Sequence, residues 1–372
     1  MAQLSIPLFK VFMAESAHAA LKPVLESGRL ATGSQVAAFE SGLATWLGVP
    51  DAVALNDASG ALTLALYMSG VRPGDEVITS PLACSATLMP IANLFAKPVW
   101  CDVDPCTGMP DASHLAALIT AKTRAILLYH WSGDVADVNG VAALARQHGI
   151  KLVEDASEAF GAESRGCKLG GEADFTVYSF YATKHINTGG EGAALLAADA
   201  QMIGTARHLR RYGIAPTKFR LPNGDLNPAF DIPLAGFNFP MNEIAATIGS
   251  EQLIHVDEIV ARHRANGQYY DAALNDIPGV RLLKRRKDSV SGFWTYALLA
   301  ERRDDLIRKL LSHGIGAQRL HMRNDGYSYF GKSIRQLPGV AEFDAQNLSI
   351  PCGWWVGDAE REIVVECIRA GW

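Results

Sequence analysis

Apolar residues along the chain form short runs that alternate with stretches of helical spacing. The runs that predict buried strands are residues 52–55, 76–79, 98–101, 124–129 and 150–154. The stretches between them that predict helices are residues 61–70, 113–119 and 138–148. Because this alternation is typical of βαβ units, the pattern predicts an α/β fold with a mostly parallel central sheet and helices on both faces.

The two ends of the chain extend this pattern. Helices are predicted at residues 16–28, with Gly28 as the stop, and at residues 36–47. A helical pattern resumes after residue 242, followed by a strand at 293–299 and a helix at 304–313. Since 372 residues are long for one core, we expect a large domain over residues 1–245 and a smaller C-terminal α+β domain over 246–372.

The stretch 174–192 contains an apolar strand and the loop that connects it to a second one, and this loop carries one lysine. Residues 175–180 predict a buried strand, Lys184 lies in the loop after it, and a glycine-rich segment, 188–192, precedes a second strand at 193–198. Partial burial at the mouth of such strands favours the uncharged amine, which is the form that makes a Schiff base. The alternative is an ordinary solvated loop lysine.

Two further positions follow strands in the same way. Asp155 ends the strand 150–154, and ligands bind beyond the carboxyl ends of the strands in open α/β sheets. Residues 56–60 (NDASG) lead from a strand into a helix, where free N–H groups attract anions. Helix capping is the simpler alternative at both positions. Neither a G-x-G-x-x-G motif nor a P-loop is found, so dinucleotide binding loses its main support.

Composition narrows the class of protein. The net charge of -5 gives no sign of a surface for nucleic acid or membrane, and no apolar run reaches the ~18 residues of a membrane span. Six cysteines are scattered without metal-site spacing, which indicates buried, reduced thiols. The first residues lack the features of a secretory signal, so a cytoplasmic location is expected.

The order of short motifs resembles that of the DegT-type sugar aminotransferases, which are pyridoxal phosphate (PLP) enzymes of fold type I. The resemblance runs from about residue 28 to the C-terminus. The segments that carry it are PGDEVI at 73–78, EDA at 154–156, SFYATK at 179–184, GFN at 236–238 and MNEI at 241–244.

This resemblance implies a role for each matched residue. Lys184 would form the Schiff base with PLP and move the proton, and Asp155 would pair with the pyridine nitrogen. Positions implied to contact the cofactor elsewhere are Ala58, Ser59 and Ser179 at the phosphate, Thr87 at the ring face, and Glu158 at the ring hydroxyl. Asn238 would reach the phosphate of the partner subunit, which makes a homodimer with shared sites. Candidate substrate contacts are His321, Tyr181 and His185, although a lone histidine is often structural.

Three departures from the family pattern affect details. Asp57 stands in the phosphate turn, and we expect its side chain to point away and cap the helix. Glu158 replaces the usual Gln or His, either as an anion or as a protonated acid. Pro240 stands where family members often have an arginine. The basic contact to the substrate would then come from His321 or Arg319. The long loop 211–238 is expected to be a flap at the dimer interface; a surface insertion is the alternative.

The resemblance implies transfer of an amino group from glutamate to a nucleotide-linked keto sugar, for polysaccharide, O-antigen or secondary-metabolite biosynthesis. One alternative is a nucleotide-sugar dehydratase that uses pyridoxamine phosphate. In that class a histidine replaces the lysine, and His185 is adjacent. Others are a non-catalytic regulator and a binding protein without PLP. The set of Lys184, Asp155, Ser179 and Asn238 favours transamination over all of them.

Overall fold

A computed structural model describes residues 5–331 and 336–372. Its centre is a seven-stranded sheet in the order β1-β9-β8-β5-β4-β2-β3. The strands are β1 Val53–Leu55, β2 Glu76–Thr79, β3 Lys97–Trp100, β4 Thr123–Tyr129, β5 Lys151–Asp155, β8 Phe175–Ser179 and β9 Ala193–Ala197. Only β9 runs against its neighbours β1 and β8, so the predicted mostly parallel sheet is confirmed.

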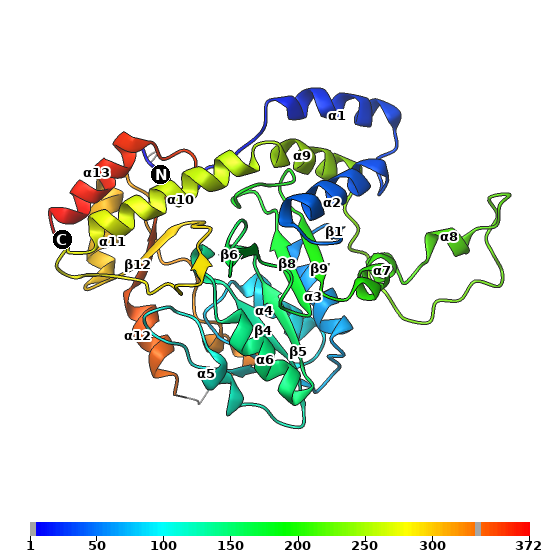
Figure 1. Ribbon diagram of the computed structural model, residues 1–372, viewed down its shortest axis with the longest axis horizontal. Helices are drawn as coiled ribbons and strands as arrows, with labels where there is room; N and C mark the ends of the chain where they lie inside the picture. Colours follow the sequence, from blue (N-terminus) through cyan, green and yellow to red (C-terminus); the bar gives the residue numbers. More distant parts are fainter. Residues whose placement is uncertain (1–4, 332–335) are drawn as a thin grey trace.

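Helices cover the sheet as the alternating pattern predicts (Figure 1). The chain moves one way along the sheet through α3 and α4, and the other way through α5 and α6. Since βαβ crossovers are right-handed, these two pairs lie on opposite faces. The helices of this part are α1 Ser16–Ser27, α2 Ser34–Leu47, α3 Ala58–Met68, α4 Ser85–Asn93, α5 Ala112–Ala116, α6 Val138–His148, α7 Ala200–Leu209, α8 Pro216–Phe219 and α9 Glu243–Leu253.

The C-terminal part has its own hydrophobic core around a second sheet, in the order β10-β12-β13. Its strands are β10 Val280–Leu282, β12 Tyr296–Ala300 and β13 Asn347–Ile350. Its helices are α10 Val256–Leu274, α11 Arg303–Ser312, α12 Pro338–Gln346 and α13 Asp358–Arg369. Ile6, near the N-terminus, belongs to this core. The expected boundary after residue 245 falls inside α9, which packs against α1 and α2 of the large part.

Some elements were not predicted. A small sheet joins β6 Glu163–Ser164, β7 Cys167–Lys168 and β11 Ser289–Val290, and short 3-10 turns occur at η1 Trp131–Gly133, η2 Asn324–Gly326 and η3 Ser328–Phe330. The expected strand 293–299 begins later, at Tyr296. Phe293 has a positive φ of 47°, which a strand does not allow, and the Gly292 N–H donates to the carbonyl of Gly133 in η1 rather than to a neighbouring strand. The cysteines are not all buried, since Cys167 is exposed.

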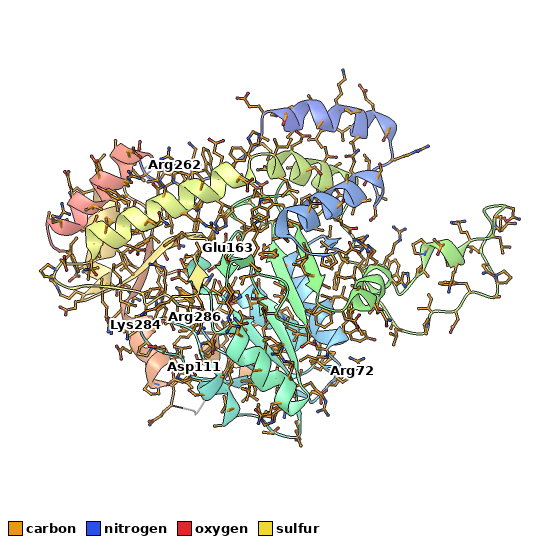
Figure 2. The ribbon with its side chains drawn as sticks, in the orientation of Figure 1. Arg72, Asp111, Glu163, Arg262, Lys284 and Arg286 are labelled. Atoms are coloured by element: carbon orange, nitrogen blue, oxygen red, sulfur yellow. The ribbon has the colours of Figure 1, made fainter. Side chains whose placement is uncertain are left out.

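The exposed side chains of Arg72 and Arg262 lie on opposite sides of the molecule in the view of Figure 2. Among the described residues, no helix combines the length and apolar character needed to cross a membrane. The loop that contains α8 extends away from the body of the protein (Figure 1). Its exposed apolar side chains include Leu226 and Leu234.

Candidate active site

A cavity of about 680 Å³ collects most of the residues selected from the sequence. It lies beyond the carboxyl ends of β5 and β8 and is closed on one side by Trp294 of the C-terminal part. The selected residues that line it are Ala58, Ser59, Thr87, Asp155, Glu158, Ser179, Tyr181, Lys184 and His321. Asn238 and His185 are outside this lining.

Asp155 is held in place by two hydrogen bonds. It is the last residue of β5, and its side chain is buried. The Thr87 hydroxyl donates to Oδ2 at 2.7 Å, and the Ser157 N–H donates to Oδ1 at 3.0 Å. A carboxylate fixed in this position can therefore accept a hydrogen bond from a protonated ring nitrogen.

Lys184 lies across the same cavity, in the loop after β8. Its side chain is 10% exposed, and Nζ is 3.6 Å from Oε1 of Glu158. The ring of Trp294 lies on another side of Nζ, with its centroid at 3.6 Å. Sequence reasoning missed Trp294, because only the fold brings the chain near residue 294 to the lysine loop.

Glu158 is a buried anion with several partners. Its Oε1 accepts from Nε2 of His321 at 2.9 Å, and its Oε2 accepts from the N–H of Ser132 at 2.9 Å. Burial disfavours its charge, but the charges of Lys184 and His321 outweigh burial and lower the pKa of Glu158 to about 2. Of the two states that the sequence left open, this environment favours the anion.

Tyr129 completes this group, and it was not selected from the sequence. Its hydroxyl is 3.1 Å from Nε2 of His321. Burial, together with the charges of Glu158 and Asp155, raises the pKa of Tyr129 well above its ordinary value. The residue therefore remains a phenol. His321 is thus held between a carboxylate and a phenol at the wall of the cavity.

The N-terminus of α3 supplies an anion site at the other end of the cavity. The Asp57 carboxylate accepts from the Gly60 N–H at 2.7 Å, so it caps the helix as expected. In the described part of the chain, no group accepts from the N–H groups of Ala58 and Ser59. Ser59 and Ser179 also line this end, where the Ser59 hydroxyl donates to the Ala86 carbonyl at 3.0 Å and the Ser179 hydroxyl accepts from the Tyr181 N–H at 3.2 Å. These donors fit a phosphate group.

His185 lies in the core, away from the cavity lining. It is 1% exposed, and its Nε2 donates to the carbonyl of Gly292 at 2.8 Å. Burial, and then the neighbouring His263, lower the pKa of His185 well below its ordinary value. The structure does not bring this side chain to a position where substrate could touch it.

Asn238 and Pro240 also lie outside the cavity. Asn238 is exposed and pairs with Arg211 through a backbone bridge. Pro240 pairs with Leu55 at the end of β1. Arg319, considered as a replacement cation, is engaged by Asp344 at 3.3 Å and does not line the cavity. His321 is the remaining candidate.

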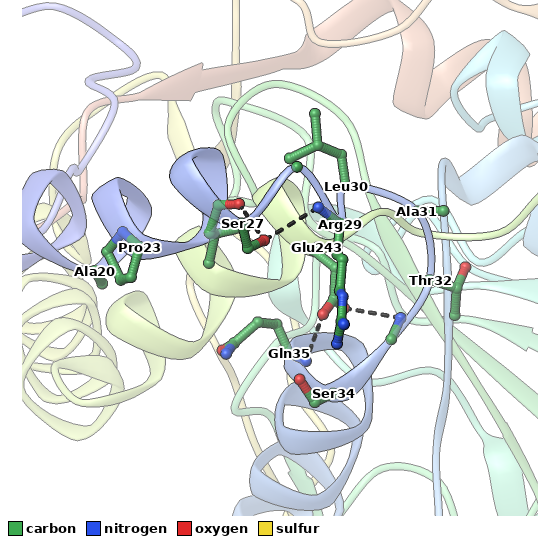
Figure 3. Close-up of a pocket in the computed structure, with 13 residues that line it drawn as sticks. Ala20, Pro23, Ser27, Arg29, Leu30, Ala31, Thr32, Ser34, Gln35 and Glu243 are labelled. Atoms are coloured by element: carbon green, nitrogen blue, oxygen red, sulfur yellow. Dashed lines mark hydrogen bonds between the residues drawn. The ribbon is translucent and has the colours of Figure 1, made fainter.

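A larger hollow of about 870 Å³ lies between α1 and the start of α2 (Figure 3). Its anion-binding groups are already occupied, because the Glu243 carboxylate accepts from the N–H groups of Gly33, Gln35 and Val36. Glu243 therefore links α9 to the start of α2 at this hollow. No group of three or more acidic, histidine or cysteine side chains in the described ranges could hold a metal.

Comparison with known proteins identifies the family of this chain. The family model described as "DegT/DnrJ/EryC1/StrS aminotransferase family" matches residues 12–369. GDP-perosamine synthase of Caulobacter vibrioides is 34% identical over 344 residues, which cover 89% of each chain. The spore coat polysaccharide biosynthesis protein SpsC of Bacillus subtilis is 30% identical over 93% of this chain and 91% of its own.

A solved structure supports the same assignment. The sugar aminotransferase CalS13 from Micromonospora echinospora superposes with a TM-score of 0.93 at 36% identity, over 99% of this chain and 100% of its own. Its fold agrees with the α/β architecture described above. The family consists of PLP-dependent sugar aminotransferases, so this chain is an enzyme. It belongs to the DegT/DnrJ/EryC1/StrS aminotransferase family.

Proposed function

We propose that this enzyme transfers an amino group from glutamate to a nucleotide-linked keto sugar, using PLP bound at Lys184. The observation that carries the proposal is the shared cavity of Lys184 and Asp155, with the phosphate-type site of α3 at its edge. A Schiff-base lysine, a carboxylate for a ring nitrogen and an anion site together match the parts of PLP. The proposed location is the cytoplasm.

The donor set of the cavity fits PLP. Lys184 would hold it covalently, and Asp155 would keep its ring nitrogen protonated. The groups that would hold its remaining parts are the Ala58 and Ser59 backbone, Ser179, Thr87 and Glu158. When bound, PLP supplies an aldehyde that accepts the amino group and a ring that takes up the electrons released at the substrate carbon.

The residues of the chain then supply the proton transfers. Lys184 would act as general base and remove the proton from the substrate carbon. It would then act as general acid and deliver the proton to the carbon that was the aldehyde carbon of the cofactor. Glu158, 3.6 Å from Nζ, would hold the amine in the cavity while it is charged. His321 and Tyr181 lie at the part of the wall left for substrate, and Tyr181 is 47% exposed.

The acceptor is inferred from relatives and from the donors in the wall. One relative is named as a synthase of GDP-perosamine, a nucleotide-linked product, and another as a polysaccharide biosynthesis protein. His321 offers a donor for a sugar or phosphate oxygen. These observations support a nucleotide-linked sugar substrate over an amino acid or a free sugar.

A homodimer with shared sites is part of the proposal. Asn238 is exposed and lies outside the active-site cavity of its own chain, while the adjacent loop carries the exposed apolar side chains of Ile232 and Leu234. Contact with a second copy would bury these groups. It would also bring Asn238 to the phosphate end of the partner's cavity.

The test uses a panel of nucleotide-linked keto sugars with nitrogen-labelled glutamate, with products scored by mass. We expect one sugar to gain the labelled amino group while 2-oxoglutarate forms. Loss of water without nitrogen gain would instead establish the dehydratase. A protein that stays colourless with added PLP, and converts no sugar, would favour the regulator or a binding protein without PLP.

A further inference from the structure

The segment Gly292–Trp294 holds the chain on both sides of Lys184. The indole N–H of Trp294 donates to the Thr183 carbonyl at 2.7 Å. On the other side, Nε2 of His185 donates to the Gly292 carbonyl at 2.8 Å. Because both neighbours of the lysine are tied to this segment, which leads into β12, the small domain determines where the lysine loop lies.

The segment itself is firmly anchored. The Phe293 carbonyl accepts from Nδ1 of His263 on α10 at 2.8 Å, and the Gly292 N–H donates to Gly133 at 2.9 Å. Phe293 keeps a positive φ of 47°, which a bulky residue adopts only when its surroundings require it. The ring of Trp294 stacks on Phe9 at 4.9 Å. Trp294 is therefore presented to Lys184 in one orientation.

The Lys184 amine lies between a ring face and a carboxylate. Nζ is 3.6 Å from the Trp294 centroid and 3.6 Å from Oε1 of Glu158. Trp294 is 5% exposed, and the Lys184 side chain is 10% exposed. Cation–π attraction is strongest with tryptophan and increases when water is excluded. Both neighbours therefore attract a positive charge at the position of Nζ.

We propose that Trp294 is a positioning residue that holds the Lys184 ammonium in a resting place whenever the amine is not bonded to the cofactor. The inference rests on the proposed function, in which Lys184 is released from the cofactor during each half of the transfer. The ring would keep the released, protonated amine inside the cavity. Without the ring, Glu158 would be left as its partner.

The first test measures the reactivity of the amine in the full-length chain after removal of PLP. An acylating reagent is added at about pH 8, and mass spectrometry compares modification of Lys184 with that of the exposed reference Lys22. We expect Trp294→Leu to raise the Lys184 to Lys22 ratio roughly two- to tenfold, because the amine is no longer attracted to a ring face and meets the reagent more often. Trp294→Phe keeps a ring face and should give a smaller rise.

The matched control is Trp354→Leu. Trp354 also packs against a lysine, since its ring centroid is 5.2 Å from Nζ of Lys10, but it does not line the cavity. The ratio should be unchanged in this variant. Equal ratios in Trp294→Leu and wild type would overturn the proposal.

The second test separates attraction from simple packing. Replacing tryptophan by its mono-, di- and trifluorinated forms weakens the charge of the ring face while largely keeping its shape. We expect modification of Lys184 to rise stepwise with the number of fluorine atoms, and no such trend in a Trp294→Phe background. Reactivity independent of fluorination would mean that Trp294 only packs, and this result decides the matter even if Trp294→Leu fails to fold.

Failure of this inference is distinguishable from failure of the proposed function. Borohydride reduction of the PLP-loaded wild type should leave the cofactor on Lys184, which tests the function alone. The acylation experiments contain no PLP and test the ring alone. A tag on Lys184 with no effect of fluorination would therefore keep the function and remove only the role of Trp294.

Discussion

Lys184 and Glu158 form an oppositely charged pair in the cavity, with Nζ and Oε1 at 3.6 Å and both side chains largely buried. A buried charge is tolerated only with partners, and each of these residues has more than one. Trp294 adds to the environment of the lysine, and His321 and Ser132 to that of the glutamate. The chemistry of the cavity therefore depends on a group of side chains rather than on the lysine alone.

Replacing the lysine tests its assignment directly. We expect Lys184→Ala to lower amino transfer from labelled glutamate by at least about a hundredfold, because no other amine is positioned to move the proton. Borohydride should then leave no cofactor attached to the chain. Lys151→Ala, which removes an exposed surface lysine, should retain full activity. Substantial turnover by Lys184→Ala would show that another residue carries the cofactor.

The low pKa of Glu158 predicts a dependence of stability on pH. Its pKa of about 2 lies below the ordinary value of 4.5, so its contribution is fully present above pH 4.5 and is lost as the pH falls through about 2. The contribution is on the order of 3 kcal/mol. Glu158→Gln cannot titrate, so the difference in free energy of unfolding between wild type and variant should shrink across this range.

Denaturant unfolding of the cofactor-free chain at several pH values measures this difference. A difference that stays constant from about pH 6 down to the acid limit would mean that Glu158 is not ionised in the folded protein. The electrostatic role assigned to it beside Lys184 would then be wrong.

At the scale of elements, the parallel strands β5 and β8 place the two principal residues at one edge of the sheet. Asp155 pairs with Val177 of β8, so the loop after Ser179 begins just beyond the carboxylate. This placement could be predicted from the sequence, because parallel strands align their carboxyl ends. The capping role of Asp57 could also be predicted, since a short acidic side chain before a helix finds its N–H groups locally.

Other elements had no local signal. Pro90 within α4 obscured its helical pattern, and β10 and β13 are too short to show a period. Tyr129 ends β4 and pairs with Asp155 of β5, so the argument from parallel strands could also have placed it at this edge. Trp294 reaches the cavity only through contacts between distant segments, which sequence periodicity does not contain.

Asp57 provides a prediction for the α3 terminus. Asp57→Ala should destabilise the protein by about 1 kcal/mol, because the Gly60 N–H loses its acceptor. Asp57→Asn keeps an acceptor and removes a negative charge near the phosphate-type site. It should therefore keep the stability and strengthen binding of PLP.

Thermal unfolding and titration with PLP separate these effects. The outcome that contradicts the role of Asp57 is equal stability of the Ala variant and wild type. If PLP affinity falls in Asp57→Asn, the carboxylate is not close enough to the phosphate to repel it, and the anion site must lie elsewhere.

At the scale of the molecule, the proposed homodimer completes the phosphate end of each cavity with Asn238 of the partner subunit. The division into two hydrophobic cores was expected from chain length, and both cores are observed. The loop 211–238 was expected as a long segment without period, and the short helix α8 lies within it. In the proposed homodimer, a second copy would cover its exposed leucines.

Mixing two inactive variants tests this arrangement. In a homodimer of Lys184→Ala both sites lack the amine, and in a homodimer of Asn238→Ala both lack the contact from the partner. A mixed dimer contains one site with neither defect, because the intact lysine of one chain meets the intact asparagine of the other. If subunits exchange freely between equal amounts of the two, half of the dimers are mixed. Roughly a quarter of wild-type activity should therefore return.

Recovery should require exchange of subunits, so it should develop over time and be absent when the two proteins are crosslinked as homodimers first. Activity and PLP absorbance are followed together, because the restored site should also retain the cofactor. If Asn238 acted within its own chain, each chain of the mixed dimer would keep its own defect. Mixing would then restore no activity. Lack of recovery despite demonstrated exchange would thus assign Asn238 to its own subunit and leave the flap without a catalytic role.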